Sequence, residues 1–136
     1  MIAESELILR LVISVLLGST VGIEREMHQS SAGMRTHALV ALGATIFTIM
    51  SLTFLNDPTR IAAGIVAGIG FIGAGAIFRS ENKVTGLTTA ANLWVVAAIG
   101  MAVGIGYYTA AVAAAIIIIV ILIVGRALEK KALRKH

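Results

Sequence analysis

Apolar residues in this chain form long runs, and the short segments between them carry almost all of the charge. The first run, Leu7–Ile23, is broken only by Arg10, and no charged residue occurs between Gly86 and Gly125. That last stretch is about twice the roughly 20 residues that a membrane-spanning helix needs, so it predicts two spans joined by a turn at the glycines of 104–106. The pattern predicts five spans: Leu7–Ile23, Ala38–Leu55, Ile61–Phe78, Leu87–Val103 and Tyr107–Val124.

The composition supports a membrane environment. Hydrophobic residues make up 58% of the chain and charged residues 13%, whereas soluble domains are roughly half apolar and a quarter charged. Almost no run shows the polar face that a helix at the surface of a soluble domain needs. The sequence therefore predicts an all-α polytopic bundle, and the absence of cysteine excludes disulfides.

The cations predict an orientation. Most of them lie in the odd-numbered connections or in the tail, so the positive-inside rule places the N-terminus outside and the C-terminus in the cytoplasm. Residues 1–125 are then a transmembrane domain and residues 126–136 a basic cytoplasmic tail. Because the positive charge belongs to membrane-flanking segments, no nucleic-acid partner is expected. These cations are Arg25, Arg35, Arg79, Lys83, Arg126, Lys130, Lys131, Arg134 and Lys135.

Small residues predict where helices approach one another closely. Helices in lipid associate through backbone contact at such positions, because no hydrophobic force drives them together. Two interpretations stay open: the seam of a homodimer, and packing within one subunit. We expect the third span at the bundle centre with Trp94 packed against it, and the Ile116–Ile119 surface of the fifth span facing lipid. The candidate packing glycines are Gly64, Gly68, Gly70, Gly73 and Gly75 in the third span and Gly100 and Gly104 in the fourth.

A first polar cluster lies in the loop after the first span. Glu24 sits at or just below the interface, where an unpaired carboxylate is costly, and Arg35 is the expected partner. This pair is either structural, or Glu24 and Glu26 form a docking surface or a cation or proton site, where two carboxylates can bind Mg²⁺ through water. No other metal or cofactor is expected. The cluster comprises Glu24, Arg25, Glu26, Arg35 and Thr36.

A second polar cluster lies on the inner half of the fourth span. It comprises Thr88, Thr89 and Asn92, and the four-residue spacing of Thr88 and Asn92 places them on one helical face. Hydrogen bonding between helices is the default role of such residues. Together with Glu24 and Arg35 they are also the candidates to line a transport path.

Several motifs then resemble the MgtC/SapB family of bacterial membrane proteins. They are Gly22-Ile-Glu-Arg-Glu26, Ala32-Gly-Met-Arg-Thr36, Gly68–Ile77 with its repeated glycines, and Val84–Ala91 followed by Trp94. The resemblance extends in order and spacing from about Gly22 to Tyr107. Some members carry a functionally associated Asn where this chain has Thr88, and some add a cytoplasmic C-terminal domain.

The resemblance implies a multi-pass protein of a bacterial or archaeal inner membrane, linked to growth and stress adaptation in low magnesium. In some pathogens such proteins are virulence factors, and restraint of the membrane-embedded ATP synthase is one proposed action. The family name suggests magnesium transport, a disputed role.

Three functions compete: a regulator acting through helix contacts, a transporter or channel, and an enzyme. No nucleophile–base pair, metal-ligand cluster or phosphate-binding loop supports an enzyme. A transport path needs polar groups throughout, and few residues offer them in the outer half. We therefore expect a non-enzymatic regulator that forms a homo-oligomer, a dimer in the simplest case, and contacts a membrane protein partner. The residues available for a path are Ser14, Ser19, Thr20, Thr45, Thr48, Ser51 and Thr53.

Overall fold

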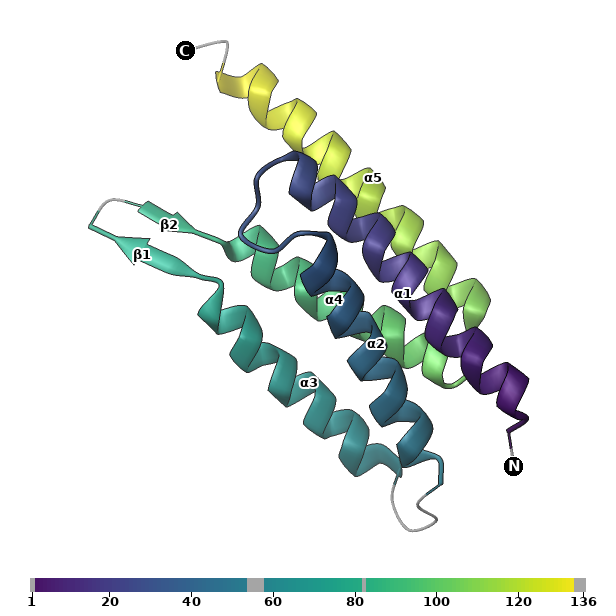
Figure 1. The fold of residues 1–136 in the computed structure, drawn as a ribbon. Coiled ribbons are helices and arrows are strands. Elements are labelled where there is room, and N and C mark those ends of the chain that lie inside the picture. The colour runs from purple at the N-terminus through teal and green to yellow at the C-terminus, as the bar shows by residue number, and fades with distance from the viewer. Residues whose placement is uncertain (1, 54–57, 82, 134–136) are drawn as a thin grey trace.

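The computed structural model describes residues 2–53, 58–81 and 83–133. Five helices run up and down in a bundle (Figure 1): α1 (Glu4–Met27), α2 (Met34–Ser51), α3 (Pro58–Gly75), α4 (Leu87–Gly104) and α5 (Tyr108–Leu133). A short antiparallel hairpin, β1 (Phe78–Ser80) with β2 (Lys83–Thr85), connects α3 to α4. The predicted helical bundle is therefore confirmed, with the hairpin as an addition.

The hairpin shortens the third predicted span. That run was expected to continue to Phe78, but α3 ends at Gly75 and Phe78 pairs with Thr85 in the hairpin. Aromatic and β-branched residues such as Phe78, Val84 and Thr85 favour strands, and glycines on both sides free the chain to turn. Gly86 does so with a φ of 89° directly before α4. The predicted end of the second span, Leu55, lies outside the described residues.

Among the described residues, four helices are long and apolar enough to cross a membrane: α1, α2, α4 and α5. The apolar part of α3, Thr59–Gly75, is shorter. The ends of α1, α3 and α5 lie at one end of the bundle with the starts of α2 and α4 (Figure 1). We call it the basic end, because Arg25, Arg35, Arg79, Lys83, Arg126, Lys130 and Lys131 belong to it. Its cytoplasmic location stays a prediction.

Helix α4 forms the centre of the bundle. It packs against each of the other four helices, and its side chains Leu93, Val96, Ile99 and Val103 are almost completely buried. Helix α3 lies at the edge beside α2 and α4 (Figure 1). The expectation that α3 lies at the centre is therefore wrong.

Glycines in α1 and in α4 allow both helices to contact the backbone of α2. A Cβ atom added to Gly18 of α1 would lie 2.7 Å from the carbonyl oxygen of His37, and one added to Gly100 of α4 would lie 2.3 Å from that of Ala41. Gly22 and Gly104 approach Met34 and Thr48 equally closely. In lipid such backbone contact contributes much of the energy of helix association.

Helix α5 packs through one face. Ala111, Ala115, Ile118 and Leu122 are buried, whereas Ile116 and Ile117 are each 58% exposed. The prediction of a lipid-facing surface thus fits Ile116 and Ile117 and is wrong for Ile118. The helix continues without a break through Gly125 to Leu133.

A polar clasp fixes the end of the bundle opposite the basic end. Arg10 donates from Nε to Glu6 Oε1 at 3.0 Å and from Nη1 to the carbonyl oxygen of Gly104 at 2.6 Å, and the Tyr108 hydroxyl donates to Glu6. A cation at the C-terminus of α4 also interacts favourably with the helix dipole. The clasp ties α1 to α4 and α5, and the i, i+4 spacing of Glu6 and Arg10 was its signal in the sequence.

The glycine contacts predict which substitutions destabilise the bundle. We expect Gly100→Ala to lower the free energy of unfolding by about 1–3 kcal/mol, because the new Cβ overpacks against the α2 backbone. Gly70→Ala is the matched control, since no atom lies within 4 Å of a Cβ at Gly70. Thermal unfolding of both variants in detergent measures the difference. Equal unfolding temperatures would contradict the close-contact account.

Candidate functional site

A charged cluster at the basic end joins α1 to α5. The Glu24 side chain is 10% exposed, and Arg126 Nη1 lies 2.8 Å from its Oε1, in an ion pair whose angle does not suit a hydrogen bond. Arg25 Nη1 lies 3.9 Å from the other oxygen. His28 approaches Oε1 at 3.4 Å and donates from Nδ1 to the Glu24 carbonyl oxygen at 2.7 Å. Two guanidinium groups thus offset the cost of a buried carboxylate.

The expected pair of Glu24 with Arg35 is wrong. Arg35 lies on an exposed face of α2 and has no ion pair among the described residues. Glu24 is directed toward α5 instead, so its partner comes from a distant part of the sequence. The sequence feature that could have indicated this partner is the position of Arg126, which is the first cation after the long apolar run that ends in α5.

Glu26 holds the hairpin between α1 and α2. Its Oε2 accepts a hydrogen bond of 2.8 Å from the backbone N–H of Met34, the first residue of α2. A carboxylate at this position satisfies a free helix N–H group and complements the dipole. Gly33 makes room for it, because a Cβ there would lie 2.7 Å from Glu26 Oε2.

The two candidate magnesium ligands therefore have different partners. Glu24 interacts with α5 and Glu26 with the start of α2. Within residues 2–53, 58–81 and 83–133, no group of three or more His, Cys, Asp or Glu side chains is arranged to hold a metal ion. A role of these carboxylates in binding Mg²⁺ stays a prediction.

A buried polar pair connects α2 to α4. His37 is completely buried and donates from Nδ1 to the Gly33 carbonyl oxygen at 2.8 Å, which leaves Nε2 to accept a bond of 3.0 Å from Asn92 Nδ2. This arrangement assigns a neutral imidazole. Asn92 itself is 2% exposed, and its Oδ1 has no hydrogen-bond partner among the described residues. Sequence reasoning named Asn92 but not its partner.

The threonines of the predicted cluster separate. Thr89 is buried beside Asn92 on the same helical face, whereas Thr88 is exposed. The expected bonding between helices is therefore found for Asn92, whereas Thr88 is exposed and makes no such bond among the described residues. Thr36 is half-buried and lies on the other side of α2, where it lines a cleft.

The buried face of α2 carries further polar side chains. The Thr45 hydroxyl donates to the Gly100 carbonyl oxygen at 2.7 Å and the Ser51 hydroxyl to that of Thr48 at 2.6 Å. Between His37 and Thr45 the same face presents Ala41, enclosed by Gly18 and Gly100. Tight apolar packing thus interrupts the polar residues of α2 halfway along the helix.

The glycines of α3 face open space instead of a neighbouring helix. No atom lies within 4 Å of a Cβ added to Gly64, Gly68, Gly70 or Gly75, and only Gly73 has ordinary contact, with Ala90. These residues do not make close contacts within the chain, and their predicted role between chains stays open. Trp94 is 51% exposed and lines a cleft between α4 and α3, and its expected packing against α3 stays a prediction.

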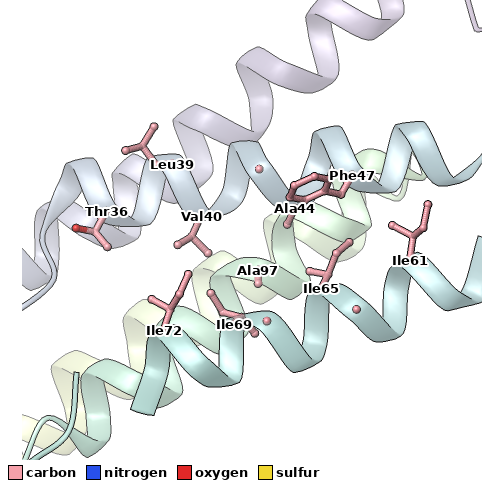
Figure 2. A pocket seen from close by; sticks show the side chains of 13 residues that line it. Thr36, Leu39, Val40, Ala44, Phe47, Ile61, Ile65, Ile69, Ile72 and Ala97 are labelled. Atoms are coloured by element: carbon pink, nitrogen blue, oxygen red, sulfur yellow. The ribbon is translucent and has the colours of Figure 1, made fainter. Parts of the chain in front are cut away.

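A larger cleft separates α2 from α3. It has a volume of about 720 Å³, and Figure 2 shows Val40, Ile65 and Ile69 directed into it from the two helices. We call it the α2–α3 groove. Its lining consists of Thr36, Leu39, Val40, Gly43, Ala44, Phe47, Ile61, Gly64, Ile65, Gly68, Ile69, Ile72 and Ala97.

A bundle of long apolar helices with buried, internally bonded polar residues defines an integral membrane protein. The chain belongs to the MgtC family, whose model matches residues 11–131. It is 51% identical over 106 residues to Protein MgtC of Salmonella typhimurium and 44% identical over 114 residues to the Putative magnesium transporter YhiD of Escherichia coli. These alignments cover 77% and 76% of this chain.

An uncharacterized protein of Synechocystis sp. is 49% identical over 110 residues, which are 79% of this chain and 47% of that protein. The matches cover 46% of Protein MgtC and 53% of YhiD, so the chain spans about half the length of the curated relatives it matches. No solved structure matches it.

The charged cluster predicts a specific energetic coupling. We expect Glu24→Gln and Arg126→Gln each to lower the stability, and a double-mutant cycle to show a coupling of about 1–3 kcal/mol. Arg126→Gln leaves the buried Glu24 with only the more distant Arg25, and Glu24→Gln removes the carboxylate that pairs with Arg126. The same cycle between Glu24 and Arg35 is the control and should give no coupling. Coupling to Arg35 instead of Arg126 would contradict the assignment.

The buried pair of α2 and α4 gives a second prediction. Asn92→Leu leaves His37 Nε2 without its donor, and we expect a loss of about 1–3 kcal/mol in the free energy of unfolding. Thr88→Val, on the exposed face of α4, should change stability little. Unfolding in detergent, followed by circular dichroism, separates the two, and similar values for both variants would refute the role of this pair.

Proposed function

We propose that the chain is a non-enzymatic regulator of a bacterial or archaeal inner membrane, linked to magnesium limitation and stress, which acts through helix contacts with a membrane protein. The single observation that carries this proposal is the close packing of α1, α2 and α4 at Ala41. Ala41 lies between Gly18 and Gly100 without space for water, and His37 and Thr45 on either side of it bond to Asn92 and to the Gly100 carbonyl oxygen. A conducting path needs polar groups or water along its whole length.

The outer face of α3 is the proposed contact surface. Small residues allow two helix backbones to approach closely, and α3 presents them away from its own bundle. The partner is a second copy, in a homodimer, or another membrane protein, of which the family resemblance suggests the ATP synthase. The face consists of Ala63, Ala67, Gly70 and Ala74, all exposed.

Cation transport is the second candidate function, because one relative bears the name Putative magnesium transporter. A path between α1, α2 and α4 would have to pass the Ala41 contact, and the α2–α3 groove offers Thr36 as its one polar lining residue among the described ones, so a route between subunits is the alternative. The buried Glu24 carboxylate at the basic end would then be its entrance.

Two measurements test the proposed regulator. Cells that lack their own family member should grow in limiting magnesium when they express this chain, and Gly70→Leu should abolish that growth because it blocks close approach at α3. The variant should still fold, since a Cβ at Gly70 meets no atom within 4 Å. Ile117→Phe, which adds bulk to the exposed face of α5, is the control and should support growth.

Liposomes that contain the purified wild-type chain should show no Mg²⁺ flux. Flux that Glu24→Gln abolishes would favour the transporter and refute the regulator.

In the growth experiment, normal growth with Gly70→Leu would refute the outer face of α3 as the contact surface.

A further inference from the structure

We propose that the α2–α3 groove binds an anionic phospholipid, with an acyl chain in the groove and the phosphate group at the cations of the basic end. This inference does not depend on the proposed regulatory function. It rests on the shape and lining of the groove and on the charge at its mouth.

The groove matches an acyl chain in chemistry and length. Among the described residues, Thr36 is the only polar one that lines the groove. Gly43, Gly64 and Gly68 also line it and place no side chain in its space. On α3 the lining extends from Ile61 to Ile72, a rise of about 16 Å at 1.5 Å per residue. One leaflet of the hydrocarbon core is about 15 Å thick. The groove therefore has the depth of a single leaflet.

Cations lie where that groove reaches the basic end. Arg35 is the neighbour of Thr36 in the first turn of α2, is exposed, and has no ion pair among the described residues. The hairpin that follows α3 adds Arg79 in β1 and Lys83 in β2, both exposed. Basic pockets between helices at the membrane surface favour anionic lipid head groups.

The carboxylates of this end do not cancel the charge. Glu24 pairs with Arg126, and Glu26 accepts the N–H of Met34. Accepting an N–H leaves the charge of Glu26 in place, but the seven cations of the basic end outnumber its four described carboxylates, which are Glu24, Glu26, Glu81 and Glu129. The charge at the mouth thus complements a phosphate diester, and its position beside an apolar groove selects a lipid over free phosphate.

Binding of defined lipids to the purified full chain tests the charge requirement. In native mass spectrometry or thermal-shift titration, phosphatidylglycerol should bind at least fivefold more tightly than phosphatidylcholine with the same acyl chains, and inorganic phosphate should have no effect. Arg35→Gln and Arg79→Gln should each weaken phosphatidylglycerol binding severalfold, whereas Arg35→Lys retains most of it. Lys131→Gln, on the exposed end of α5, is the control and should bind as wild type does.

A pair of glycine variants tests the groove itself. Gly68→Leu fills the groove and should abolish the preference for phosphatidylglycerol, whereas Gly70→Leu adds the same bulk on the outer face of the same helix and should keep it. Neither new Cβ meets an atom within 4 Å, so both variants should fold. A circular dichroism spectrum and an unfolding temperature like those of the wild type verify this.

Three results would overturn the lipid site: equal binding of phosphatidylcholine, unchanged binding by Gly68→Leu, or a change of subunit number in Gly68→Leu with lipid binding intact. The last result would show that the groove holds a second copy of the chain.

Discussion

The structure depends on the close approach of two helices to the backbone of α2. Gly18 and Gly22 of α1 contact it from one side, and Gly100 and Gly104 of α4 from the other. Lipid gives helices no hydrophobic reason to associate, so contact at van der Waals distance over a whole helix must supply the attraction. A methyl group at any of these glycines would separate α2 from its neighbour along its length.

The buried polar residues follow from that contact. Because α1 and α4 pack closely on α2 around Ala41, His37 and Thr45 bond to the nearest atoms available, which are Asn92 and the carbonyl oxygens of Gly33 and Gly100. In an environment without water, each such bond also specifies one alignment of the helices, because an unpaired group would be costly. Glycine contact sets the distance between the helices and the hydrogen bonds set their register.

The long apolar runs predicted the helices well, because the bilayer sets the length of a span and each run is continuous in the sequence. The partners of polar residues were harder to predict. Glu24 and Arg126 are about a hundred positions apart in a chain of 136 residues, and only the packing of α5 on α1 brings them together. The glycines of α3 misled for a related reason. Small residues indicate that a backbone is accessible, but not whether the neighbour comes from the same chain.

Helix α5 is one rigid rod of 26 residues, about 39 Å long, with no joint at Gly125. Arg126 lies near the point where this rod leaves the bundle, and there it is tied to Glu24. A partner that tilts or rotates the end of α5 around Lys130 would therefore strain the Arg126–Glu24 ion pair. Through α1 the strain would reach the glycine contacts between α1 and α2. Binding at the C-terminal end of α5 is therefore coupled to the packing of the bundle.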